Sequence, residues 1–126
     1  MGLIFDTSAW IELFLGNSEK AEDALKNDKI YTSIATFSEV VNWCFKNEKE
    51  KCIDEYIKAI RNASSILNID DNIALTSGKI NFERKKIVKN WGMMDSIILS
   101  TAIFYNLRIL TKDSHFKDLE NADMIS

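Results

Sequence analysis

Three aspartates occupy positions where folding can bring carboxylates together. Asp6 and Asp113 each follow a short apolar run closely, and Asp95 precedes a strongly apolar segment. A carboxylate at the end of a buried strand is costly to desolvate unless it is paired, capped or bound to a metal. The plain alternative for each is a helix N-cap, which accepts hydrogen bonds from the amides of the next turn. Three such acids on one edge of a sheet would form a shared site.

Glu39 is a fourth candidate, although its position also suits a solvated surface glutamate. It lies beside the apolar stripe of a predicted helix, formed by Phe37, Val40 and Val41. It can join the aspartates only if that helix lies against the same edge of the sheet. Three or four carboxylates without thiols or imidazoles favour Mg²⁺ or Mn²⁺ over Zn²⁺. Such a site supports metal-assisted phosphoryl transfer or phosphodiester hydrolysis.

Strand-like and helix-like patterns alternate along the whole chain. Short apolar runs predict strands at Gly2–Phe5, Ile30–Thr32, Ser65–Ile69, Arg108–Thr111 and Ala122–Ile125. Apolar residues three and four apart predict helices around residues 7–14, 21–25, 34–45, 53–60, 73–87 and 95–105. In this prediction Gly92 ends the helix of residues 73–87, Asp95 opens the last helix, and Asn106 is its C-cap.

This alternation predicts an α/β domain with a mainly parallel sheet of four to five strands and helices on both faces. Sheets of this kind place their sites at the carboxyl ends of the strands, near a topological switch point. The 126 residues suit one domain, covering 1–126.

Composition excludes several classes of function. The single histidine, His115, excludes RNA cleavage by a pair of imidazoles, and its position suggests a partly exposed residue at a helix start. The net charge of −3 argues, taken alone, against nucleic-acid binding. No glycine-rich phosphate loop is present. The spacing of acids fits neither a receiver domain, which needs an acidic pair after the first strand, nor a haloacid-dehalogenase-type phosphatase, which needs D-x-D there.

We expect a cytoplasmic protein without a membrane anchor. The sequence shows no secretory leader pattern, and its longest apolar-rich run, Ile97 to Tyr105, is too short to span a bilayer. Cys44 and Cys52 have no metal-finger spacing, so reduced thiols are expected.

Four short motifs, in order, resemble the acidic motifs of PIN-domain ribonucleases. They are I-F-D-T-S around Asp6, S-E-V around Glu39, M-D-S-I-I around Asp95 and L-T-K-D-S-H-F around Asp113. Their order, spacing and total length resemble the VapC-type toxins of toxin–antitoxin pairs, over the whole chain. The chain departs from the family's pattern at Asn106, where members often have glycine, and in lacking a proline before the Glu39 helix.

The resemblance implies a PIN-like three-layer sandwich and a metal-dependent endoribonuclease. In that reading Mg²⁺ or Mn²⁺ is bound, and water is activated against an RNA phosphodiester, by Asp6, Glu39, Asp95 and Asp113. Supporting hydroxyls that orient the acids or a bound water are implied for Thr7, Ser8 and Thr111. The implied partners are an RNA substrate and a cognate antitoxin, and we also expect a homodimer. An exposed apolar groove near Trp10, Phe14 or Trp43 could receive an antitoxin helix, and these aromatic residues fit the core equally well.

A basic segment precedes Asp95 in the sequence. Residues 79–89 contain five basic side chains and one acid, a local charge of +4. The segment is either a solvated helix face or a rim that contacts RNA phosphates. The candidate substrate-binding residues are Arg84, Lys85, Lys86 and Lys89.

Two other functions remain open within the same fold. One alternative is an RNA-processing nuclease outside any toxin–antitoxin pair. The other is a module that binds RNA or protein without catalysis. The presence of all four acids disfavours the non-catalytic version. The sequence leaves open the RNA target, the cleavage site and the number of metal ions.

Overall fold

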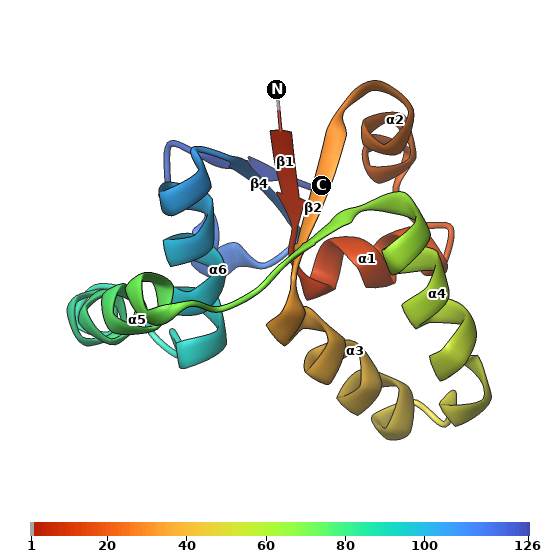
Figure 1. Ribbon diagram of the computed structural model, residues 1–126, viewed down its shortest axis with the longest axis horizontal. Coiled ribbons are helices and arrows are strands. Elements are labelled where there is room, and N and C mark those ends of the chain that lie inside the picture. The colour runs from red at the N-terminus through yellow and green to blue at the C-terminus, as the bar shows by residue number, and fades with distance from the viewer. Residues whose placement is uncertain (1) are drawn as a thin grey trace.

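A five-stranded parallel sheet forms the centre of the protein (Figure 1). The computed structural model describes residues 2–126. The strands are β1 (Gly2–Phe5), β2 (Lys29–Ser33), β3 (Ser65–Leu67), β4 (Arg108–Thr111) and β5 (Ala122–Met124). Their order is β3-β2-β1-β4-β5, and every neighbouring pair is parallel. The predicted parallel α/β sheet is confirmed.

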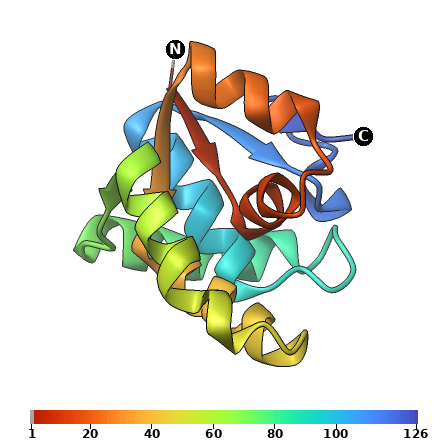
Figure 2. The ribbon, with the colours of Figure 1, turned by 90° about the vertical axis from the view of Figure 1, so that its right-hand side faces the viewer.

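Helices cover both faces of the sheet, which gives three layers. The helices are α1 (Thr7–Phe14), α2 (Glu19–Asn27), α3 (Ile34–Lys46), α4 (Ile53–Ala63), α5 (Asp71–Arg84) and α6 (Met93–Tyr105). Two 3₁₀ turns follow α3 and β4, η1 (Glu50–Cys52) and η2 (Ser114–Phe116). In Figures 1 and 2, α1 to α4 lie to one side of the central strands and α5 and α6 to the other.

The central strand β1 separates two apolar cores. Leu3 and Phe5 pack with residues of α1 to α4, whereas Ile4 packs with α6 and the turn before it. Phe5 and Ile4 are both fully buried. Because β1 is covered on both faces, its sequence is continuously apolar rather than alternating.

Short polar side chains fix where the helices begin and end. Asp6, Ser18 and Asp70 cap the N-termini of α1, α2 and α5, each accepting a hydrogen bond from a backbone amide three residues on. Asn106 follows α6 with φ of 54°, the left-handed conformation that asparagine adopts more readily than most residues. The predicted C-cap at Asn106 is therefore confirmed.

The boundary between α5 and α6 differs from the prediction. Helix α5 ends at Arg84 instead of continuing to Ile87, and Gly92 is the N-cap of α6 instead of the end of α5. The cause is Trp91, whose side chain is fully buried, packs against Phe116 and donates to Ser96. The segment after Arg84 leaves the helix, and this indole lies in the core.

The crossover pattern places the site. From β1 the chain moves outward through β2 to β3, and then returns to β4 on the other side of β1. The carboxyl ends of β1 and β4 thus lie side by side where the chain direction reverses, which is where parallel sheets bind ligands. Within residues 2–126, no helix has both the length and the apolar character needed to cross a bilayer.

Candidate metal centre

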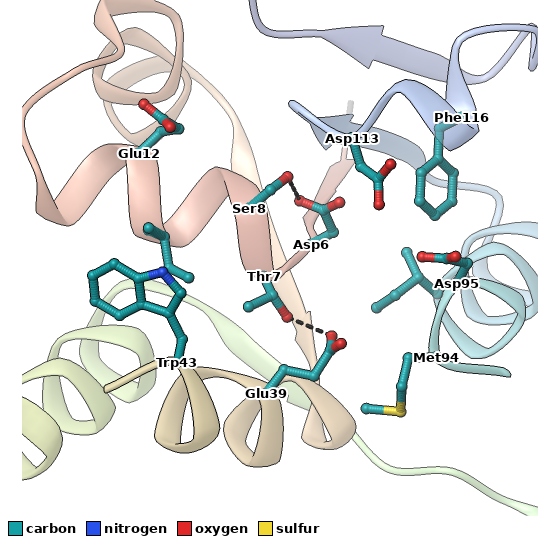
Figure 3. A pocket seen from close by; sticks show the side chains of 12 residues that line it. Asp6, Thr7, Ser8, Glu12, Glu39, Trp43, Met94, Asp95, Asp113 and Phe116 are labelled. Atoms are coloured by element: carbon teal, nitrogen blue, oxygen red, sulfur yellow. Dashed lines mark hydrogen bonds between the residues drawn. The ribbon is translucent and has the colours of Figure 1, made fainter. Parts of the chain in front are cut away.

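The four predicted acids lie around one cleft at the carboxyl end of the sheet (Figure 3). Asp6 follows β1, Asp113 follows the neighbouring β4, Glu39 comes from α3 and Asp95 from the first turn of α6. All four line a cleft of about 300 Å³. The structure therefore brings together residues that are up to 107 positions apart in the sequence.

Asp6 is the most buried of the four acids and is held by hydroxyl groups on both oxygens. Its Oδ1 accepts from the hydroxyl of Ser8 at 2.6 Å and from the amide of Ala9 at 2.9 Å. Its Oδ2 accepts from the hydroxyl of Thr111. Burial raises the pKa of Asp6 to about 6, although these hydrogen bonds work in the opposite direction. The ionised form is thus costly in the metal-free protein.

The same hydroxyls join the two turns that carry Asp6 and Asp113. Thr111 Oγ1 accepts from the amide of Asp113 at 2.9 Å, and Ser8 Oγ accepts from the amide of Lys112 at 2.9 Å. Since Thr111 also donates to Asp6, one side chain orients two of the acids. Ser8 and Thr111 are two of the three hydroxyl residues that the resemblance named, and both donate a hydrogen bond to Asp6.

Glu39 reaches the cleft from α3 and is anchored at one oxygen. Thr7 donates its hydroxyl to Glu39 Oε1 at 2.6 Å. Within residues 2–126 no hydrogen bond engages Oε2, which is therefore available to a ligand. Partial burial raises the pKa of Glu39, and the charges of Asp95 and Asp113 raise it further.

Asp95 lies on the opposite wall, in the first turn of α6. Its Oδ2 accepts from the amide of Gly92 at 3.1 Å, so it also secures the start of the helix. Burial raises its pKa, and the charge of Asp113 adds to the effect. Asp95 is therefore not the N-cap that was the plain alternative for it: Gly92 holds that position, and Asp95 supports it from the third residue of the helix while lining the cleft.

His115 faces two of the acids, a position that sequence reasoning missed. The residue lies in η2 and is partly exposed, as expected, but its Nδ1 lies 3.2 Å from Asp95 Oδ2 and 3.4 Å from Asp113 Oδ1. The contact with Asp95 joins residues 20 positions apart, which the pattern of either segment does not reveal. The only available signal was that His115 lies two residues after Asp113.

The donor set fits a divalent cation. Within the described part of the chain, the only ion pairs made by the four acids are those with His115. Four carboxylates without a compensating lysine or arginine repel each other, and a divalent ion would relieve that repulsion. Asp95, Asp113 and His115 each offer a ligand atom, and these atoms all lie within 4.8 Å of one another.

The basic segment of residues 79–89 contains side chains that are hydrogen-bonded within the protein and side chains that are exposed to solvent. Arg84 donates to both oxygens of Asp118 at 2.7 and 2.8 Å and to the carbonyl of His115 at 3.1 Å. Its side chain is only 11% exposed and lies over the ring of Trp91. Lys85 donates to the carbonyl of Trp91. The structure leaves Lys86 and Lys89, together with Lys79, exposed to solvent.

Two of the three aromatic residues proposed for a partner groove face other parts of the molecule. Trp10 is fully buried and donates its indole hydrogen to Thr32, so it cannot meet a partner. Of the two alternatives for Trp10, the structure shows the core position, in which its ring packs against Phe5 and Phe14. Trp43 lines the acidic cleft. Phe14 stacks on Tyr56 and borders a separate groove between α1, α2 and α4.

The comparisons with known proteins agree with this fold. The family model for the PIN domain matches residues 3–122, and the chain belongs to the PIN domain family. A toxin–antitoxin complex from Klebsiella pneumoniae contains a similar chain, with 26% identity and a TM-score of 0.73, covering 97% of this chain and 96% of that one. A search of curated protein sequences finds no match.

Two further solved structures share the fold at lower identity. A chain of VapBC2 from Rickettsia felis, bound to a promoter DNA fragment, has 18% identity and a TM-score of 0.80 over 100% of both chains. VapC20 from Mycobacterium tuberculosis, a sarcin–ricin-loop-cleaving toxin, has 8% identity and a TM-score of 0.79, over 98% of this chain and 99% of its own.

Burial of the acids predicts how stability depends on pH. Asp6 has a higher pKa in the folded protein than in the unfolded chain, so folding is favoured at low pH and loses this contribution as pH rises through about 6. Without metal, the free energy of unfolding should therefore fall by roughly 2 kcal/mol through Asp6 alone between pH 4 and pH 7.5. Urea unfolding in the presence of a chelator measures this.

The variant Asp6→Asn isolates the contribution of Asp6. It should remove most of this fall and leave the protein no less stable than wild type at pH 7.5. Asp71→Asn, which alters an exposed carboxylate on α5, is the matched control and should keep the wild-type dependence. A difference in unfolding free energy between wild type and Asp6→Asn that stays constant from pH 4 to pH 7.5 would contradict the assignment.

Proposed function

We propose that this protein is an endoribonuclease that uses Mg²⁺ or Mn²⁺ to hydrolyse RNA phosphodiester bonds. One observation carries the proposal: Asp6, Glu39, Asp95 and Asp113 surround one cleft and are paired with no lysine or arginine in residues 2–126. Oxygen-rich sites of this kind suit hard divalent cations. Membership of the PIN domain family supports the same activity.

The side chains of the site have two roles: carboxylates would hold the cation, and hydroxyls hold the carboxylates in position. Asp6, Glu39, Asp95 and Asp113 would hold the cation, which, when bound, lowers the pKa of a water molecule and polarises the phosphoryl oxygens. The hydroxyls of Thr7, Ser8 and Thr111 keep the carboxylates in place, so little reorganisation is needed when substrate binds. In the hydrolysis the water oxygen bonds to phosphorus, the bond to the leaving ribose oxygen breaks, and that oxygen gains a proton.

We propose further that the nuclease is the toxin of a type II toxin–antitoxin pair. The support is that the similar solved chains come from a toxin–antitoxin complex and from VapBC assemblies. The alternatives are an RNA-processing nuclease outside such a pair and a non-catalytic PIN module. A gene for a small DNA-binding protein directly upstream would favour the toxin over both alternatives. A cytoplasmic location goes with this proposal, and the two free cysteines suit a reducing compartment.

An apolar groove between α3 and α4 is suited to an antitoxin helix. It is lined by Phe37, Val41, Phe45 and Ile57, and the ring of Phe45 is 60% exposed. Amphipathic helices commonly insert their apolar face into grooves of this kind. Helix α3 also carries Glu39, so a partner seated here lies next to the wall of the acidic cleft.

We also propose a homodimer. Apolar side chains remain exposed on the other side of the molecule, including Leu75 on α5 and Ile103 and Phe104 on α6. Such side chains gain by burial against a second copy. Sedimentation at micromolar concentration should give twice the mass of one chain, and a monomer there would overturn this part of the proposal.

The nuclease proposal predicts a cation-dependent activity. Purified protein should cleave RNA in Mg²⁺ or Mn²⁺ and lose the activity when a chelator is added. Asp6→Asn should lower the cleavage rate at least about a hundredfold, because loss of one acid weakens the metal and misplaces the water. Gel analysis of labelled RNA fragments measures both effects.

The exposed acid Asp71 provides the control for this experiment. Asp71→Asn should cleave at the wild-type rate. Cleavage that resists the chelator, or full activity in Asp6→Asn, would overturn the nuclease assignment.

A second prediction concerns the basic segment. Lys86→Gln with Lys89→Gln should weaken RNA binding and make the salt dependence shallower, by about 0.7 in the slope of log K against log salt for each lost phosphate contact. Arg84 is left intact because its guanidinium holds Asp118 and η2. Fluorescence anisotropy at several salt concentrations, with catalytically inactive Asp6→Asn as the background, measures this slope.

The comparison pair removes two exposed lysines from a distant face, Lys26 on α2 and Lys58 on α4. If both double variants have the same salt slope as their background, the basic segment is a solvated helix face and not part of the RNA interface.

The toxin proposal predicts an effect at the α3–α4 groove. Phe45→Glu should weaken the complex with the product of the adjacent upstream gene at least about tenfold, because it places a charge in an apolar contact. RNA cleavage by the free protein should not change. Equal binding of wild type and Phe45→Glu, measured by titration calorimetry, would exclude this groove as the antitoxin site.

A further inference from the structure

His115 is the single histidine of the chain, and the hydrolysis described above does not use it. We propose that His115 Nδ1 is a ligand of the divalent cation, together with the carboxylates of Asp95 and Asp113, and that this nitrogen makes the centre prefer Mn²⁺ to Mg²⁺. This inference rests on the proposed function for the presence of a cation. It goes beyond that function in naming a nitrogen ligand and a metal preference.

The distances around His115 match those between ligands of one ion. Ligand atoms about 2.1 Å from an octahedral ion lie about 3 Å from their neighbours in the same shell. His115 Nδ1 lies 3.2 Å from Asp95 Oδ2 and 3.4 Å from Asp113 Oδ1. Each of these three residues can offer one atom within 4.8 Å of the atoms of the other two. A single ion can therefore bind all three with small adjustments of the side chains.

The backbone of His115 is secured independently of the imidazole ring. Its amide donates to Asp113 Oδ1 at 2.9 Å, and its carbonyl accepts from Arg84 at 3.1 Å. Arg84 is itself fixed by its double hydrogen bond to Asp118 and lies over Trp91. These contacts hold η2 in place and keep the ring beside the carboxylates of Asp95 and Asp113.

The chemical type of the ligand atom, nitrogen or oxygen, decides which metal ion is bound more tightly. Mg²⁺ prefers oxygen ligands and keeps much of its hydration shell, whereas imidazole is a ligand of the first-row transition metals. Mn²⁺ has a size and charge similar to those of Mg²⁺ and also accepts a nitrogen ligand. A centre with several carboxylates and one imidazole should thus bind both ions, with the larger benefit for Mn²⁺.

A purely structural role for His115 makes a different prediction. In that role Nδ1–H donates to Asp95 and Asp113 and only orients them, so both ions would lose affinity equally when the ring is removed. His115→Asn keeps a side-chain amide that can donate a hydrogen bond but lacks the imidazole nitrogen. This variant therefore separates the ligand from the orienting donor.

The direct test is pulsed electron paramagnetic resonance of Mn²⁺ bound to the full-length protein. A coordinated imidazole couples its ¹⁴N nucleus to the manganese electrons. Because the chain has one histidine, protein labelled with ¹⁵N only in histidine must change this coupling if His115 is the ligand. We expect the ¹⁴N signal in wild type, its replacement on ¹⁵N-histidine labelling, and its loss in His115→Asn.

Calorimetric titration gives the second readout. His115→Asn should weaken Mn²⁺ binding about tenfold and Mg²⁺ binding less than about threefold. Lys117→Gln, an exposed neighbour in the same segment, is the matched control and should bind both ions like wild type. Melting temperatures of the metal-free variants show whether each of them is folded.

The outcomes separate this inference from the proposed function. Mn²⁺ binding that requires Asp95 but shows no histidine coupling overturns the inference and leaves the nuclease proposal standing. Equal losses of Mn²⁺ and Mg²⁺ affinity in His115→Asn also overturn it. Failure of wild type to bind either ion overturns both proposals.

Discussion

The burial of Asp6 at the end of the central strand is the constraint on which the rest of the site depends. The carboxylate is nearly inaccessible, and burial raises its pKa to about 6. It is tolerated because hydroxyls from the start of α1 and the end of β4 donate to its two oxygens. The same hydroxyls accept from the backbone that carries Asp113. The ionised carboxylate of Asp6 is therefore costly to bury, and a cation bound beside it would offset that cost.

The parallel topology explains why the acids meet and why each is also a structural residue. Asp6 caps α1, Asp113 caps η2, and Asp95 secures the first turn of α6. Helix N-termini stabilise carboxylates, so these contacts fix the orientation of the side chains. An acid that secures a helix start can therefore line the cleft at the same time.

Basic residues that are adjacent in the sequence have separate roles in the structure. Arg84 is committed to Asp118, Trp91 and the backbone of His115, and it secures the turn beside the cleft. Lys86 and Lys89 remain exposed to solvent, and the ammonium of Lys86 lies 4.1 Å from the centre of the Phe82 ring. The early end of α5 causes this separation, because the chain turns back to bury Trp91.

The sequence by itself determined the layered α/β fold and marked Asp6 and Asp113, because strand and helix periods and the residues that follow strands are local signals. It also determined the capping role of Asn106. The tertiary structure decided that Glu39 of α3 and Asp95 of α6 join them at one cleft, since this depends on where the two helices lie against the sheet. Only the tertiary structure decided that His115 faces Asp95, that Arg84 is committed to Asp118, and that Trp10 fills the core. These three facts depend on contacts between segments distant in the sequence, and the direction of a side chain across such contacts is set by packing rather than by local pattern.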